Sequence, residues 1–462
     1  MPSSNSRSLF GPLRDSAAYR YPPDLPDEDR PSYDLPTEVI SQIVAFNSDN
    51  KKLLLKYSVV SRAWRRACLP WICRKADLET RRHFQRWNAL VKSSPDTANF
   101  VRRVRFVPVT WKAKAIIGPS ALKDIPSLPV MPAAKELKWA PFFRFLKCAV
   151  PITPLITRFL RCFPSLRRIE IHSAFLDIRS LECFIGHCGP VKELVLNVAF
   201  EHEPLKNGNR NNQAASQHLD ISGFDLTSLE HLTIESNGYF RSEWVVDSLF
   251  ANSKPQRLRS LTIETFLGEL FNMDCYPLTS LFASSLEHLT LTTPQRQHPS
   301  GLTDPILEPL PALRILTLIV GTTFIPLKQT KLEEFLSHLQ AESLVVLELK
   351  FRGIKRPYEV TKRLRRLGWK QLCALALKQF PKLEKLVLWF ASEEYIPQRR
   401  RTELLEEVEI NVPNSYLGGK EVAVSWSVES RYAKPCDSDL EEYDSEFDSD
   451  DEYGQSESES NE

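Results

Sequence analysis

The sequence lacks the features that would place the protein in a membrane or in an oxidising compartment. No segment approaches the roughly 18 consecutive apolar residues of a membrane-spanning helix. Residues 1–20 contain no apolar stretch typical of a secretory signal, and no N-x-[ST] glycosylation site occurs. The nine cysteines include no C-x-x-C pair. These absences predict a cytoplasmic and/or nuclear protein that makes no use of a membrane.

Catalytic and cofactor-binding motifs are also missing. The Gly-Gly-Lys sequence at 418–420 lacks the upstream glycine of a phosphate-binding loop, and neither G-x-S-x-G nor H-E-x-x-H occurs. Cys183, His187 and Cys188 fall on one predicted helix, but their spacing favours a structural cluster over a zinc site. We therefore expect no catalytic residue, no metal and no cofactor. An enzyme whose residues meet only in space is the most distant alternative.

Basic residues are missing from one end of the sequence. No Lys or Arg follows Lys434, whereas thirteen Asp and Glu residues lie between Asp437 and Glu462. The remainder has 60 basic residues and the other 45 of the 58 acidic ones, so it carries a charge of about +15. The net charge of +2 therefore conceals a basic body and an acidic segment, which we interpret as a disordered tail over residues 435–462.

The acidic tail contains four serines with an acidic residue three positions later, the pattern favoured by acidophilic kinases of the casein kinase II type. These candidate phosphorylation sites are Ser438, Ser445, Ser449 and Ser456. Phosphorylation would add further negative charge. We hypothesise that the tail folds over the basic body and competes with an acidic partner; the simpler alternative is a solubilising tail.

The first patterned segment covers residues 34–75, after an arm over residues 1–33 that we expect to be disordered. Asp34 is a potential helix cap, and a proline at position 36 is tolerated in a first turn. Apolar residues then follow with helical spacing, a second apolar group covers residues 53–57, and a third helix is predicted to start at Ser61. Three short helices form a core too small to be stable alone, which predicts a partner or a neighbouring domain.

Two parts of this segment resemble the F-box family. Residues 35–40 read LPTEVI, and residues 54–65 read LLKYSVVSRAWR. The sequence from Phe84 to Val104 resembles that of fungal F-box proteins in particular. The resemblance covers only about a tenth of the chain, and a generic helical hairpin is the alternative. It implies docking to the Skp adaptor and the cullin of an SCF ubiquitin ligase, through Leu35, Pro36, Val39, Ile40, Ile43, Val60 and Trp64.

Residues 76–163 have no clear repeat. Prolines recur between positions 108 and 154, interleaved with Trp111, Trp139 and several phenylalanines. Proline at this density interrupts regular structure, whereas the aromatic residues argue against simple disorder. We therefore predict a helical or irregular linker with a proline-rich aromatic insertion.

A repeated L-x-x-L-x-L pattern dominates residues 164–434. It occurs at 166/169/171, 191/194/196, 229/232/234, 258/261/263, 286/289/291, 313/316/318, 344/347/349, 383/386/388 and 405/408/410, with a weaker copy at 101/104/106. Helices are predicted between several copies, at 178–188, 243–252, 332–339 and 369–380. The pattern favours an α/β fold, an irregular leucine-rich-repeat solenoid with parallel strands on its concave face and helices on its convex face. Unrelated βα units are the alternative.

The strand pattern also predicts which side chains line the concave face. Thr233, Thr262, Thr290 and Thr317 would form a ladder across neighbouring strands. Polar residues there give way to apolar ones toward the end of the array. Candidate partner-binding residues on this face are His231, Thr262, His288, Ile319, Lys350 and Trp389. The alternative is that threonine serves strand propensity and that Trp389 is covered by the chain.

Together these patterns predict a substrate-recognition adaptor of an SCF-type ubiquitin ligase. The F-box-like segment would bind the Skp adaptor, and the repeats would hold an unidentified target protein. The rival is a repeat scaffold that acts outside ubiquitin transfer and binds protein or nucleic acid through its basic body. Nucleic acid is the less favoured partner, because the short basic runs at 362–366 and 399–401 resemble solvated surfaces.

Overall fold

The structure is a computed structural model of the 462-residue chain. It describes residues 35–428 except for 79–80, 107–127, 141–153, 176–177, 201–223, 237–248, 251–254, 266–278, 280, 293–308, 321–328, 355–363, 366, 393–397 and 413. The predicted α/β class is confirmed: the described part has a 12-stranded sheet in which all paired neighbours are parallel. None of the described helices is long and apolar enough to cross a membrane.

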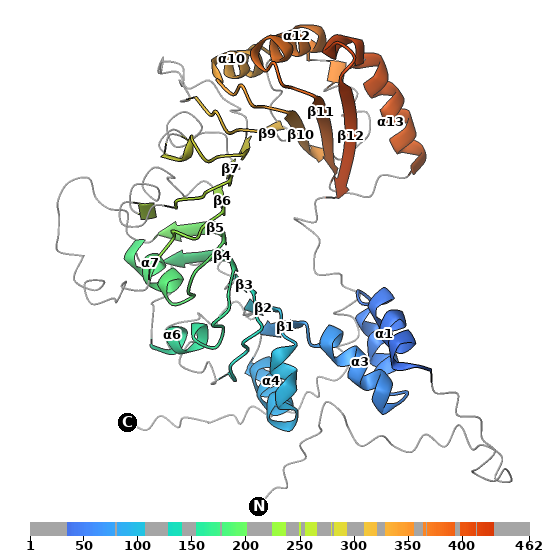
Figure 1. The fold of residues 1–462 in the computed structure, drawn as a ribbon, viewed down its shortest axis with the longest axis vertical. Coiled ribbons are helices and arrows are strands. Elements are labelled where there is room, and N and C mark those ends of the chain that lie inside the picture. Colours follow the sequence, from blue (N-terminus) through green and yellow to red (C-terminus); the bar gives the residue numbers. More distant parts are fainter. Residues whose placement is uncertain are drawn as a thin grey trace, which may run out of the picture.

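The strands follow each other in sequence order from one edge of the sheet to the other. They are β1 (Lys75–Leu78), β2 (Arg103–Phe106), β3 (Glu136–Trp139), β4 (Arg168–Phe175), β5 (Glu193–Phe200), β6 (His231–Ser236), β7 (Ser260–Thr265), β8 (His288–Thr292), β9 (Ile315–Val320), β10 (Val346–Ile354), β11 (Lys385–Ser392) and β12 (Glu421–Val428). Figure 1 shows that they line the inner side of a wide arc. Because every strand pairs only with its neighbours, no crossover interrupts this face.

A repeated backbone contact fixes the register at the start of the strands. The carbonyl of Arg74, just before β1, accepts hydrogen bonds from the N–H groups of Arg102 and Arg103 at 2.8 and 3.0 Å. The carbonyl of Arg102 accepts from Lys135 and Glu136 in the same way, and the arrangement continues along the sheet. The residue before each strand therefore stands level with its equivalent before the next strand.

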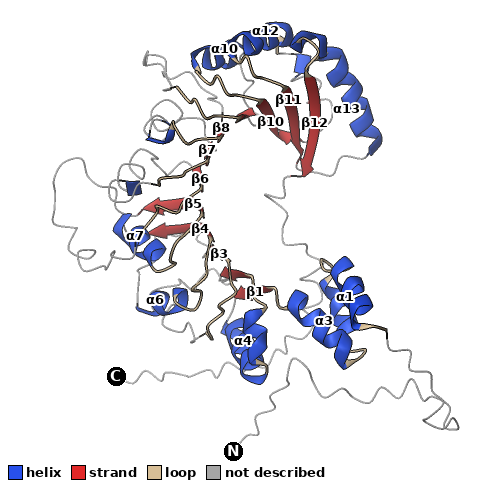
Figure 2. Ribbon diagram, in the orientation of Figure 1, coloured by secondary structure: helices blue, strands red, loops and turns tan. Residues whose placement is uncertain are grey.

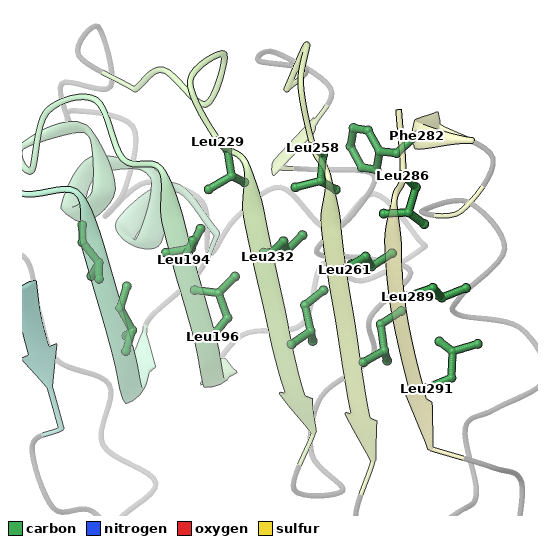
Figure 3. Packing of buried hydrophobic residues seen from close by; sticks show 14 of the residues in the cluster. Leu194, Leu196, Leu229, Leu232, Leu258, Leu261, Phe282, Leu286, Leu289 and Leu291 are labelled. Atoms are coloured by element: carbon green, nitrogen blue, oxygen red, sulfur yellow. The ribbon is translucent and has the colours of Figure 1, made fainter. Parts of the chain in front are cut away.

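Apolar side chains of the repeated pattern stack from strand to strand behind the sheet. Leu194 pairs in register with Leu232, which pairs with Leu261 and then with Leu289. All four are buried in one continuous core, as Figure 3 shows. The predicted copies at 166/169/171 to 383/386/388 supply strands β4 to β11, and the weaker copy at 101/104/106 supplies β2. A one-residue slip would expose this whole row, so the burial specifies the register.

Helices cover the outer side of the arc (Figure 2). They are α4 (Arg81–Ser93), α6 (Pro154–Leu160), α7 (Ile178–Gly186), α10 (Gln329–His338), α12 (Trp369–Gln379) and α13 (Gln398–Asn411), with short 3-10 turns η2 (Pro95–Asn99) and η4 (Asn414–Leu417). The helices predicted at 178–188, 332–339 and 369–380 are therefore confirmed. The one predicted at 243–252 lies almost wholly outside the described residues.

The sheet begins earlier than the repeats predicted. Strands β1 and β3 lie where the sequence indicated an irregular linker over residues 76–163, on either side of β2, the strand of the weaker copy. Their repeat positions carry Cys73 before β1 and Ala134 before β3 in place of the first leucine, which hid the pattern. Trp139 of β3 is completely buried and stacks on Phe106 at a centroid distance of 4.4 Å. This segment is thus an integral part of the core.

The last predicted repeat, at 405/408/410, is wrong. Residues 398–411 form helix α13, in which Leu404 and Val408 are buried whereas Ile410 is 73% exposed. The final strand is instead β12, at residues 421–428. A turn at Gly418 and Gly419, with φ of 62° and 83°, precedes it and requires a backbone conformation that favours glycine.

The predicted helices near the start of the chain form a separate small module. They are α1 (Thr37–Phe46), α2 (Lys51–Ser58) and α3 (Arg62–Ile72), followed directly by β1. Pro36 occupies the cap position of α1, while the expected cap Asp34 lies outside the described residues. Helix α3 begins at Arg62, next to the predicted start at Ser61, and Ser61 caps it by accepting a hydrogen bond from the N–H of Trp64 at 3.4 Å.

Candidate functional site

The module of α1 to α3 buries few residues and exposes many apolar ones. Its fully buried core comprises Ile40, Val44, Leu54 and Cys68. Six of the ten exposed large apolar side chains among the described residues belong to it: Leu35, Val39, Phe46, Leu55, Val59 and Val60. Phe46 is 91% exposed and Val60 is 65% exposed. Large apolar groups gathered on so small a module are typical of a protein-binding surface.

The predicted docking residues divide into an exposed group and an internal group. Leu35, Pro36, Val39 and Val60 are exposed, and Ile43 is half-buried. Val39, Ile43 and Phe46 are three or four residues apart on α1, which places them along one helical stripe, and Leu35 lies just before the helix. This set is available for direct contact with a partner.

Ile40 is buried instead, and Trp64 is half-buried against the core of the module. The ring of Trp64 packs on Tyr57 with 5.0 Å between ring centroids. These two residues therefore shape the module. Phe46 was missed by the motif comparison, because only its position at the end of α1 and its exposure single it out.

On the inner face of the sheet, side chains that point away from the core form rows, because neighbouring strands pair in register. Thr233, Thr262, Thr290 and Thr317 stand on four consecutive strands, β6 to β9, and pair directly with one another. The predicted threonine ladder is therefore confirmed. It continues to Glu348 on β10, whose carboxylate accepts a hydrogen bond from the Thr317 hydroxyl at 2.7 Å.

Three of the predicted concave-face residues meet near the end of the sheet. Ile319, Lys350 and Trp389 pair in register on β9, β10 and β11. The ammonium of Lys350 lies 5.2 Å from the centroid of the Trp389 ring, a cation–π geometry. The sequence placed Ile319 on the accessible surface, but this prediction is wrong because Ile319 is only 3% exposed. Lys350 and Trp389 are half-buried and present part of their surface.

The other predicted residues lie elsewhere on the same face. His231 and His288 are exposed at the first positions of β6 and β8, with Ser260 between them in register. Thr262 is half-buried within the threonine ladder. These three residues form a polar region that is separate from the Lys350–Trp389 pair.

An ion pair that the sequence did not predict crosses the inner face. The guanidinium of Arg352, on β10, binds the carboxylate of Glu264, on β7, through two hydrogen bonds of 2.7 Å. The side chains are 12% and 13% exposed. The sequence did not indicate this contact, because the two residues are 88 positions apart and two strands lie between the strands that carry them.

A second charged cluster lies near the opposite edge of the sheet. Glu170 on β4 accepts hydrogen bonds from Lys138 on β3 and from His172, whose Nε2 lies 2.7 Å from the carboxylate. Partial burial by itself raises the pKa of Glu170, but the hydrogen bonds and charges of His172 and Lys138 outweigh it and hold this pKa at about 2. The carboxylate is therefore fixed in its charged form at neutral pH.

The cysteine and histidine group that raised the question of zinc is held by backbone contacts. His187 Nδ1 lies 2.6 Å from the carbonyl oxygen of Cys183, and the Cys188 thiol donates to the carbonyl of Phe184 at 3.3 Å. In the part of the chain that the structure describes, no group of three or more potential ligands could hold a metal ion. The candidate phosphorylation sites between residues 438 and 456 lie outside that part.

Comparison with known proteins assigns no family to this chain. No protein-family model matches it, and no curated protein sequence matches it. The exposed module and the inner face of the sheet are thus the two surfaces on which a functional proposal rests.

Proposed function

We propose that the protein is a substrate-recognition adaptor of an SCF-type ubiquitin ligase. Helices α1 to α3 form an F-box that docks on the Skp adaptor, and the sheet with its outer helices forms a leucine-rich-repeat solenoid that binds a target protein. The adaptor catalyses nothing itself. It raises the rate of ubiquitin transfer by holding lysines of the target close to the charged enzyme of the ligase.

The observation that supports this proposal best is the set of exposed apolar residues on the helical module. A stable isolated domain would bury Phe46, Val59 and Val60, because each exposed apolar side chain forgoes about 1.5–3 kcal/mol of transfer free energy. Their location within the segment that resembles an F-box agrees with docking to Skp. The inner face of the sheet is a second surface on the same chain, as the adaptor function requires.

The rival function is a repeat scaffold that acts outside ubiquitin transfer. The basic character of the body, about +15 without the acidic tail, is the observation that favours it. The two proposals differ in what the helical module binds. Only the adaptor proposal requires a tight contact between this module and Skp.

Binding of the full-length chain to purified Skp adaptor tests the proposal. We expect Val60→Glu to weaken binding at least tenfold, by about 1.4 kcal/mol or more, because a charge would be desolvated in an apolar interface. Ile410→Glu is the matched control: Ile410 is 73% exposed and Val60 is 65% exposed, but Ile410 lies on α13. This control should bind Skp like the wild type.

Two results would count against the adaptor proposal. The first is failure of the wild-type chain to bind Skp, and the second is equal binding by the wild type and Val60→Glu. Circular dichroism of the variants excludes loss of folding as the cause of weak binding. If the wild type binds, affinity capture with the wild type and with Val60→Glu then separates target proteins from proteins recruited through the ligase.

A further inference from the structure

A row of basic residues runs along the starts of the first five strands. The residue immediately before each of these strands is basic, and backbone hydrogen bonds join each of these residues to the next. In order, they are Arg74, Arg102, Lys135, Arg167 and Lys192. All five are exposed. Neighbouring strands are about 4.8 Å apart, so five positive charges are spread over about 19 Å. We call these five residues the basic row.

The basic row differs from the rest of the same edge. Along β6 to β9 the equivalent positions alternate in sign: Glu230, Arg259, Glu287 and Arg314. Lys192, the last member of the row, forms a 2.5 Å ion pair with Glu230. The charge pattern thus changes from uniform to alternating at the boundary between β5 and β6.

Most members of the basic row lack a carboxylate partner. Arg102 donates to the backbone carbonyl of Ala133 at 3.3 Å, and Arg74 lies over the ring of Trp71 at 5.5 Å. Neither these two nor Lys135 and Arg167 form an ion pair with any described carboxylate. By contrast, Arg103 and Arg168, one position further along, pair with Glu136 and Glu193 at 2.7 Å. Like charges gathered in this way repel one another and attract anions.

We propose that the basic row binds the acidic segment of the same chain, residues 437–462. This segment carries thirteen carboxylates and no basic residue, so its charge complements the row. Tethering gives it a high effective concentration compared with any free polyanion. The complex masks the row until an acidic partner displaces the tail, and phosphorylation of the tail serines strengthens the masking.

The length of the chain permits this contact. Thirty-four residues follow Val428, the last residue of β12, and they span up to about 115 Å when extended. The sheet measures about 53 Å along its eleven strand intervals, from β12 to β1. Because the sheet forms an arc, the direct distance between its two ends is shorter than its length along the strands (Figure 1). The acidic residues can therefore reach the basic row without rearrangement of the sheet.

Zero-length carbodiimide cross-linking of the full-length chain, followed by mass spectrometry, tests the proposal. The reagent joins lysine amines to carboxylates in contact, and residues 435–462 contain no lysine of their own. We expect links from the tail to Lys135 and Lys192 at least about fivefold more abundant than links to the exposed Lys370 and Lys378. These links should disappear in 0.5–1 M salt, where the screening length falls to about 3–4 Å.

Two triple variants provide the comparison. Arg74→Gln/Arg102→Gln/Arg167→Gln leaves both reporter lysines in place and should reduce their links to the tail at least about fivefold. Arg257→Gln/Arg259→Gln/Arg314→Gln removes three exposed arginines near the starts of β7 and β9 and should leave the links unchanged. The salt dependence of the wild type decides the matter if the first variant does not fold.

Several outcomes would overturn the proposal. Three are a lack of links to the basic row, links spread evenly over the surface, and equal loss of links in both variants. The fourth is that the links join two copies of the chain, which a mixture of isotope-labelled and unlabelled chains would show. Phosphorylation of the tail by an acidophilic kinase should raise the salt concentration needed to remove the links; a decrease would contradict the masking role. None of these results depends on binding to Skp.

Discussion

Arg352 and Glu264 form a bidentate ion pair across the inner face of the sheet, from β10 to β7. The strands that carry them are about 14 Å apart along the sheet, at three strand intervals. The two side chains meet because the concave curvature brings the ends of inward-pointing groups closer together than their backbones. Ile319, on one of the two strands that the pair crosses, is buried. The pair thus links β7 to β10 across the inner face, and its two side chains occupy part of the predicted binding face.

Removal of one partner of this pair should destabilise the protein strongly. We expect Arg352→Met to lower the free energy of unfolding by about 3 kcal/mol, because the carboxylate of Glu264 would stay nearly buried without its partner. Urea unfolding measures this change. The double variant Arg352→Met/Glu264→Met should lose less than the sum of the single variants, and strict additivity would show that the two side chains do not interact.

Glu170 should make stability depend on pH in the acid range. Its pKa is lowered from 4.5 to about 2, so its contribution is complete above pH 4.5 and is lost as the pH falls toward 2. We expect Glu170→Gln to cost about 2 kcal/mol at pH 7 and progressively less between pH 4.5 and 2. Unfolding measured over this range, with the more exposed Glu421→Gln as control, tests it. A constant difference between wild type and Glu170→Gln would refute the assignment.

Trp139 should be essential to the core although it lies in a segment without a clear repeat. Its ring packs against Phe106, Phe159 and Phe184, so we expect Trp139→Ala to lower the free energy of unfolding by about 3–5 kcal/mol. The buried indole N–H has no hydrogen-bond partner among the described residues. Trp139→Phe should therefore cost less than about 1.5 kcal/mol. Similar losses in both variants, measured by denaturant unfolding, would contradict this packing.

The buried cysteines should react slowly in the native protein. Burial raises the pKa of the Cys73 thiol, although Lys51 opposes the shift, and it likewise raises that of Cys373, each to about 11. Burial raises the pKa of Cys188 as well. At pH 7.5 we expect alkylation of these three thiols to be at least about a hundredfold slower than in the denatured chain. Labelling followed by mass spectrometry measures the rates, and rapid native labelling would show that the thiols are accessible.

Local pattern was sufficient to predict most of the architecture. Side chains along a strand alternate between its two faces, so copies such as Leu258/Leu261/Ile263, whose apolar residues point into the core, specified β7 and its neighbours. The same alternation predicted the threonine ladder between Thr233 and Thr317 on the opposite face. Ser61 likewise marked the start of α3, because a side-chain cap acts within one turn. These features depend on residues that are close in the sequence.

The remaining features were decided by contacts between distant residues. Cys73 and Ala134 occupy leucine positions of the repeat, and only pairing with adjacent strands identifies β1 and β3. The apolar spacing at Leu404, Leu405 and Val408 suits either a strand or a helix, and packing against the body selects the helix. Sequence alone determined that the chain has a basic body and an acidic segment. Tertiary structure decided where that charge gathers, since backbone pairing of strands about 30 residues apart aligns Arg102, Lys135 and Arg167 along one edge.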